Sequence, residues 1–117
     1  MVILSTMPTG MGGQWQLVKY SDDFYAYGTE KELNSFLGTS VDKCGTLDEV
    51  LNHCLNIAEL CKKHIAKYEV EKQKSKNPNG WQILIEHEQK ELAMVMEFAK
   101  ILSHRTLKTA AMCEKSL

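Results

Sequence analysis

The sequence predicts an α+β protein in which a small antiparallel β-sheet at the N-terminus is followed by a short helix and a long antiparallel helical hairpin. Three observations predict it. Residues 1–28 contain short alternating runs rich in aromatic side chains. Residues 46–74 and 80–113 repeat apolar side chains at three- and four-residue steps, and a Pro-Asn-Gly turn signal separates them. With 117 residues, 44% of them hydrophobic, we expect a single domain over 1–117.

The N-terminal sheet is predicted from two runs of alternating or aromatic residues. Residues 14–20 alternate in the way of a half-buried strand, and residues 24–27 form a second run with three aromatic side chains. Ser, Asp and Asp between them, at 21–23, are typical of a turn. A hairpin follows from these features, and residues 2–6 are expected to add a third strand.

A short helix is predicted next, over residues 29–38. Thr29 and Glu32 have the spacing of a capping box, in which the hydroxyl and the carboxylate each satisfy a free backbone N–H. Gly38 suits the position that ends a helix. Residues 39–45 are expected to form a loop.

The helical hairpin carries the clearest pattern in the chain. Thr46 and Glu49 form a second capping box, after which one apolar stripe continues to residue 68. The second helix carries a main stripe that faces the first helix. It also has a second stripe on nearly the opposite face, made by Ile83, Met94, Phe98, Ile101 and Met112.

The length of the hairpin predicts a partner. Helices of about 28 to 34 residues are roughly 42 to 51 Å long, whereas a compact domain of this size is about 35 Å across. We therefore expect the second stripe, around Phe98 and Ile101, to lie uncovered within one chain. A two-fold homodimer with a four-helix layer would bury it.

Composition excludes several function classes. The net charge of −1 argues against a protein built to neutralise nucleic acid, although six lysines between residues 62 and 76 keep that partner as a weaker alternative. No apolar stretch is long enough for a membrane span, and no signal peptide is visible. Cysteines within a helical stripe favour a reducing compartment, so we expect a cytoplasmic protein. Thirteen lysines against one arginine are typical of AT-rich coding DNA, as in many phages and mobile elements.

Several residues with catalytic or metal-binding chemistry have simpler interpretations. Cys54, Cys61 and His64 lack the fourth ligand of a zinc site, so the two cysteines are interpreted as core residues. His87 and Glu91 have the spacing of the H-E-x-x-H motif, but a glutamate replaces its second histidine. Neither metal nor cofactor is expected.

Two further candidates for chemistry are weak. Cys44 precedes a helix start, where the positive end of the helix can make a thiol nucleophilic, but no base is within reach along the chain. The glycine-rich residues 9–13 precede a strand, whereas a phosphate-binding loop leads into a helix.

Aromatic residues concentrated in the first 28 positions are the best functional clue, because aromatic side chains often anchor partners. Together with the second stripe they predict a binding surface for a protein or ligand, made by Trp15, Tyr20, Tyr25, Tyr27, His87, Met94, Phe98, Ile101 and Arg105. The favoured function is a small non-enzymatic protein that docks on another macromolecule and blocks or scaffolds it, as inhibitors, antitoxins and phage counter-defence proteins do. The alternatives are a small-ligand binder with a pocket at the sheet–hairpin or dimer seam, and a metal- or cysteine-dependent enzyme.

Overall fold

A computed structural model describes residues 1–8, 13–34 and 43–115, with side chains up to residue 106. It shows the predicted α+β architecture of an N-terminal antiparallel sheet, a short helix and two long packed helices. The elements, in chain order, are β1 (Val2–Pro8), β2 (Gln14–Ser21), β3 (Phe24–Thr29), α1 (Glu30–Asn34), β4 (Cys44–Gly45), α2 (Leu47–Lys74) and α3 (Pro78–Lys115).

The sheet has the strand order β1-β2-β3-β4, and each pair of neighbours is antiparallel. The pairing of Leu17 with Tyr27 places both side chains on the face that packs against the hairpin, where they are buried. Val18 and Ala26, paired one residue along, point to the other face, which α1 covers with Leu33. The alternation read from the sequence therefore reflects a sheet that is covered on both sides.

The two-residue strand β4 was not predicted, since residues 39–45 were expected to form a loop. It pairs with β3 and leads into the start of α2 through Gly45, whose φ of 146° is a conformation that favours glycine. A Cβ at this position would lie 2.8 Å from a carboxylate oxygen of Glu49. This close turn joins the sheet to the hairpin.

The helix starts predicted at Thr29 and Thr46 are confirmed, and the hydroxyl of each capping threonine accepts the expected hydrogen bond. The Thr46 hydroxyl accepts a hydrogen bond from the Glu49 N–H at 3.3 Å and donates one to the Glu49 carboxylate at 3.1 Å. The Thr29 hydroxyl accepts from the Glu32 N–H at 3.2 Å. The predicted extension of the short helix to Gly38 lies outside the described residues, as do residues 9–12 of the glycine-rich loop.

The helical hairpin is the longest feature of the molecule. The connection is shorter than predicted, since α3 begins at Pro78 and only residues 75–77 separate it from α2. Proline is well placed in the first turn of a helix, because its missing N–H has no partner there in any case. None of the helices in the described part of the chain is both long enough and apolar enough to cross a bilayer.

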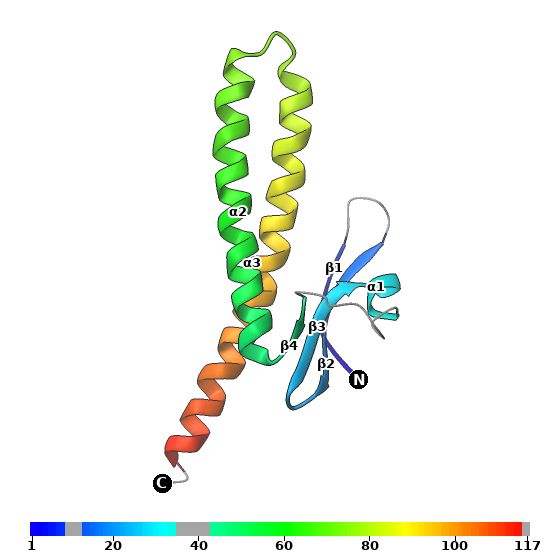
Figure 1. The fold of residues 1–117 in the computed structure, drawn as a ribbon, viewed down its shortest axis with the longest axis vertical. Helices are drawn as coiled ribbons and strands as arrows, with labels where there is room; N and C mark the ends of the chain where they lie inside the picture. Colours follow the sequence, from blue (N-terminus) through cyan, green and yellow to red (C-terminus); the bar gives the residue numbers. More distant parts are fainter. Residues whose placement is uncertain (9–12, 35–42, 116–117) are drawn as a thin grey trace.

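The main core lies where the sheet packs on the base of the hairpin. It combines Leu17, Tyr25 and Tyr27 of the sheet with buried residues of both helices, which are Val50, Cys54, Ala58, Met94, Val95, Phe98, Ala99 and Leu102. In Figure 1 the sheet lies beside the lower part of the hairpin, and the upper part extends beyond it. The overall dimensions of 62 × 32 × 22 Å follow from this arrangement.

Candidate functional site

Tyr27 marks the place where the sheet covers the hairpin. Its ring lies 5.8 Å from that of Phe98, and its hydroxyl is hydrogen-bonded to Nδ1 of His53 at 2.7 Å. Phe98 is fully buried. The expectation that this part of the second stripe needs another chain to cover it is therefore wrong, because the protein's own sheet provides the cover.

The same side of the hairpin is uncovered farther toward its tip. Residues seven or fourteen apart lie on nearly the same side of a helix. Leu60 therefore lies in the column of His53, and Leu84 lies in the column of Phe98, with Glu91 between them. Leu60 is 46% exposed and Leu84 is 44% exposed. Ile83, five helical turns before Ile101, is 66% exposed. We call this uncovered surface the distal face, defined by Leu60, His64, Ile83, Leu84 and His87.

The projecting part of the hairpin is held together by its own contacts. The ring of Tyr68 packs on His64 at 5.9 Å and on Trp81 at 5.8 Å, and therefore links α2 to α3. Nearer the tip, the Lys72 ammonium donates a hydrogen bond to the Gln82 side-chain oxygen at 2.5 Å. The distal face is thus presented by two helices that support each other without the sheet.

Four residues predicted for a binding surface are core residues instead. Tyr25, Tyr27, Met94 and Phe98 are at most 4% exposed, so they offer no surface to a partner of the folded chain. The sequence identified Tyr25 and Tyr27 by their aromatic run, and Met94 and Phe98 by their position on the second stripe. It could not show that the sheet folds back onto the base of α3.

The other predicted surface residues are not brought together into one site. Trp15 packs against the main core and lies under the Lys43 ammonium, which is 4.7 Å from its ring centre. Tyr20 pairs with Phe24 at 5.6 Å, at the turn between β2 and β3. Ile101 packs on the main core, Arg105 is half-buried near the end of the described side chains, and His87 is exposed on α3.

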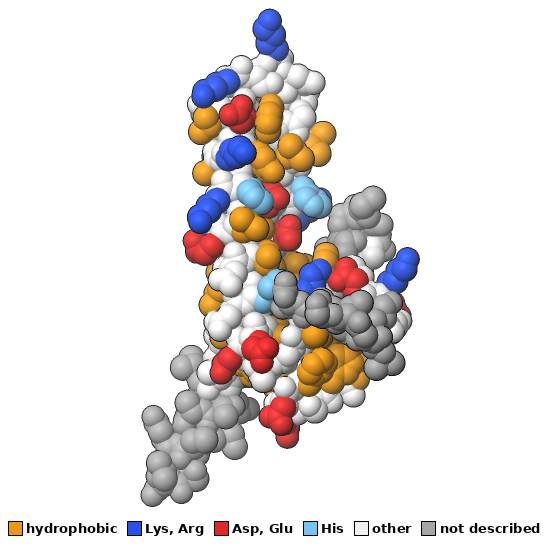
Figure 2. Space-filling view, viewed as in Figure 1, with side chains coloured by type: hydrophobic (Ala, Val, Ile, Leu, Met, Phe, Trp, Pro, Cys, Tyr) orange, Lys and Arg blue, Asp and Glu red, His pale blue; other side chains and the backbone are white. Residues whose placement is uncertain are grey.

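A polar cluster interrupts the apolar seam between α2 and α3 just beyond the sheet. The thiol of Cys61 and the carboxylates of Glu88 and Glu91 bring their ligand atoms within 4.8 Å of one another. We call these three residues the seam cluster. Nδ1 of His64 lies 3.4 Å from a carboxylate oxygen of Glu88. Figure 2 shows histidine and acidic side chains gathered on the hairpin above the sheet.

The cluster strongly favours the protonated thiol. Burial, the hydrogen bond to Glu88 and the charges of Glu91 and Glu88 together raise the pKa of Cys61 to about 12. Cys61 is only 2% exposed, and the Glu88 side chain is 15% exposed. Two carboxylates and a polarisable sulfur atom therefore meet in a largely dehydrated position between the helices.

This cluster joins parts of two motifs that the sequence presented separately. Cys61 and His64 had been grouped with Cys54, and Glu91 with His87. Among the side chains that the structure describes, neither Cys54 nor His87 belongs to the seam cluster. The residue numbers, together with the length of the connection, could have predicted these contacts, because residues equally far from the connection face each other in an antiparallel hairpin. His64 and Glu88 are each 11 residues from the ends of the 75–77 connection, and Cys61 and Glu91 are each 14.

The other candidate cysteines have structural surroundings. Cys54 is fully buried in the main core, and burial raises the pKa of its thiol to about 12. Cys44, on β4, is half-buried beside the Val18, Ala26 and Leu33 cluster. Core packing accounts for both positions, as the sequence predicted for Cys54.

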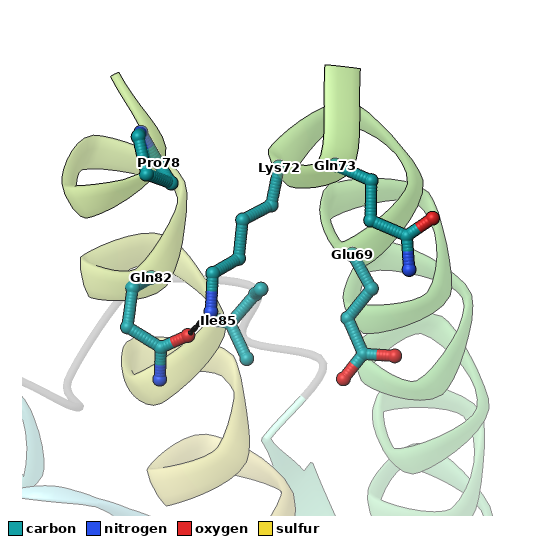
Figure 3. A pocket seen from close by; sticks show the side chains of 6 residues that line it. All are labelled: Glu69, Lys72, Gln73, Pro78, Gln82 and Ile85. Atoms are coloured by element: carbon teal, nitrogen blue, oxygen red, sulfur yellow. Dashed lines mark hydrogen bonds between the residues drawn. The ribbon is translucent and has the colours of Figure 1, made fainter. Parts of the chain in front are cut away.

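A recess of about 300 Å³ lies near the tip of the hairpin, between the ends of the two long helices. Its lining is mostly polar or charged, as Figure 3 shows, and consists of Glu69, Lys72, Gln73, Pro78, Gln82 and Ile85. Small-molecule sites are usually lined by apolar and aromatic side chains, so this recess does not favour a small organic ligand. It also lies away from the sheet–hairpin seam, where a pocket was expected.

The sequence matches no protein-family model and no curated protein, and the structure matches no solved structure.

Proposed function

We propose that this chain is a non-enzymatic binding protein that works as a homodimer, with the distal face as the contact between the two copies. In this role it occupies or bridges a surface of another macromolecule. One observation carries the proposal: the side of α3 that is buried at Phe98 and half-buried at Ile101 has exposed apolar residues at Leu84 and Ile83, nearer the tip. An exposed apolar surface on rigid helices is typical of an association site.

A second copy is the occupant that the shape of the chain favours. The sheet stands beside one end of the hairpin only (Figure 1), which leaves room beside the other end. Two copies related by a two-fold axis can therefore place their distal faces together, with their sheets at opposite ends of a four-helix layer. Each uncovered column is then buried by its counterpart.

Charge favours the same antiparallel orientation. Residues 60–90, which form the part of the hairpin beyond the sheet, carry seven lysines against four acidic residues, a net charge of +3, whereas the rest of the chain carries seven basic residues against eleven acidic ones, a net charge of −4. Antiparallel pairing brings the basic arm of one copy toward the acidic base of the other. A parallel pair would place like charges side by side, so added salt should weaken the antiparallel dimer.

The proposal is tested by measuring the mass of the protein in solution by sedimentation equilibrium. Wild-type protein should sediment as a dimer. Leu84→Glu places a charge in the centre of the distal face and should produce monomers with unchanged helix content, because Leu84 contributes little to the monomer core.

Phe24→Glu is the matched control, because Phe24 is similarly exposed but lies on the sheet, away from the hairpin. It should leave the dimer intact. A wild-type monomer at all concentrations, or a dimer that survives Leu84→Glu and Ile83→Glu, would exclude the distal face as the contact.

A further inference from the structure

The seam cluster has more acidic groups than its surroundings neutralise. Glu88 and Glu91 lie three residues apart on α3, so both carboxylates point to the same side of the helix. Within the described part of the chain, neither forms an ion pair with a lysine or arginine, and the basic side chain beside Glu88 is His64, whose ring is charged only when it is protonated. Two carboxylates so close together in a partly dehydrated position create a negative potential that a bound cation would offset.

The donors also have the chemistry of a metal site rather than of a simple ion pair. Cys61 adds a sulfur atom to the two carboxylate oxygens, and all three ligand atoms lie within 4.8 Å of one another. Thiolate, imidazole and carboxylate groups are the ligands that zinc and similar divalent transition metals use in proteins. Magnesium and calcium prefer oxygen ligands alone and would leave the thiol unused.

From this geometry we propose that Cys61, Glu88 and Glu91 bind one divalent transition-metal ion of the zinc type between α2 and α3, and that the Cys61 thiol releases its proton to solvent as the ion binds. The site goes beyond the proposed dimer, since every ligand comes from one chain. His64 has a supporting role, because its ring nitrogen lies 3.4 Å from the Glu88 carboxylate and can orient it. Three protein ligands leave one coordination position for a water molecule or an incoming ligand.

The location of the cluster explains what the metal would do for the fold. The sheet supports the base of the hairpin, and the Tyr68–Trp81 contact supports its upper part. Cys61 and Glu88 lie between these two regions, where a polar seam replaces apolar packing. A bound ion would cross-link the helices at this point and would stabilise the folded chain, since the unfolded chain has no preformed site.

Cobalt(II) is the probe that distinguishes a thiolate-containing site from adventitious binding. The purified full-length chain is first treated with a chelator, then titrated with Co²⁺ while its absorption spectrum is recorded. We expect one equivalent to bind, with a sulfur-to-cobalt charge-transfer band and the ligand-field bands of a four-coordinate ion. Zn²⁺ should displace the Co²⁺ and raise the melting temperature.

Variants assign the ligands. Cys61→Ser should abolish the charge-transfer band, Glu91→Gln should weaken Co²⁺ binding at least tenfold, and His64→Gln should weaken it by about 10- to 100-fold as an outer-shell change. The matched controls are His87→Gln, on the same helix, and Cys44→Ser combined with Cys113→Ser, which retain the proposed ligands. They should bind Co²⁺ as the wild type does.

The inference fails if the wild type shows no charge-transfer band, or if the band persists in Cys61→Ser. Circular dichroism checks that each variant folds. If Cys61→Ser is unfolded, Glu91→Gln decides, because it is nearly isosteric with the wild type and only half-buried. Co²⁺ affinity equal to that of the wild type in folded Glu91→Gln would also overturn the site. Leu84→Glu, which should be monomeric but keeps all proposed ligands, should bind Co²⁺ as the wild type does. Co²⁺ binding therefore tests the metal site separately from dimer formation.

Discussion

Phe98 lies where the sheet packs against the two long helices. It belongs to α3, lies against Tyr27 of β3 and is fully buried in the main core. Its removal would leave a cavity at the junction of the sheet and both helices. Periodicity identified it as apolar, but only the structure shows that the sheet covers it.

Phe98→Ala should lower the free energy of unfolding by about 3–5 kcal/mol, because it removes a large buried ring and leaves a cavity. Chemical denaturation checks this value. Met96→Ala is the control on the same helix, and because Met96 is 44% exposed it should change stability by only about 0.5 kcal/mol. Equal effects for the two variants would show that Phe98 does not lie in the core.

Cys54 and Tyr27 predict how stability depends on alkaline pH. Burial raises the pKa of the Cys54 thiol from 9.0 to about 12, and burial also raises the pKa of Tyr27 above its usual value of 10. Between about pH 9 and pH 12 the thiol ionises in the unfolded chain and remains protonated in the folded chain. The stability present below pH 9 is therefore lost as the pH rises through this window.

The expected loss is about 1.4 kcal/mol per pH unit for each such group, once the pH exceeds its pKa in the unfolded chain. Urea denaturation between pH 8 and pH 11 measures it. Cys54→Ala should give a shallower decline, since it removes one of these groups. A decline of the same slope in both proteins would show that Cys54 is not protected in the folded state.

At the scale of elements, the sequence predicted the features that depend on residues close together in the chain. The caps at Thr29 and Thr46 and the periodicity of the two long helices each depend on neighbours within one or two turns, and the structure confirms them. The start of α3 at residue 78 instead of 80 follows from the tolerance of proline in a first turn.

Non-local features were beyond the reach of these signals. The pairing of β4 with β3, and the packing of the sheet on the base of α3, join residues far apart in the chain. Predicting the seam cluster requires the register of the hairpin, and this register depends on a connection, residues 75–77, that is two residues shorter than the predicted 75–79. The sequence shows Cys61 with His64, and His87 with Glu91, as separate pairs, but nothing local indicates that Cys61 faces Glu88 and Glu91.

The N-cap of α2 provides a test at this scale. Thr46→Ala removes the hydroxyl that accepts from the Glu49 N–H and should lower the free energy of unfolding by about 1 kcal/mol. Thr46→Ser keeps the hydroxyl and should remain close to wild type. Thermal denaturation followed by circular dichroism compares the three proteins, and a neutral Thr46→Ala would mean that the cap contributes nothing.

At the scale of the whole molecule, the determining feature is the mismatch between the long hairpin and the small sheet. The radius of gyration of 16.9 Å exceeds the roughly 13–14 Å of a compact domain of this length. The sheet covers the base of the hairpin, while the distal face retains exposed apolar side chains. The proposed contact with a second copy therefore lies at Leu60, Ile83 and Leu84, and not at Phe98 as the sequence had indicated.

Small-angle X-ray scattering of the wild-type protein tests this central claim most directly, because it measures mass and shape together. If two copies pair through their distal faces, the forward scattering should correspond to twice the chain mass of 13.3 kDa, with a radius of gyration well above the 16.9 Å of one chain. A mass of one chain and a radius of gyration near that of the single chain, at every concentration measured, would contradict it.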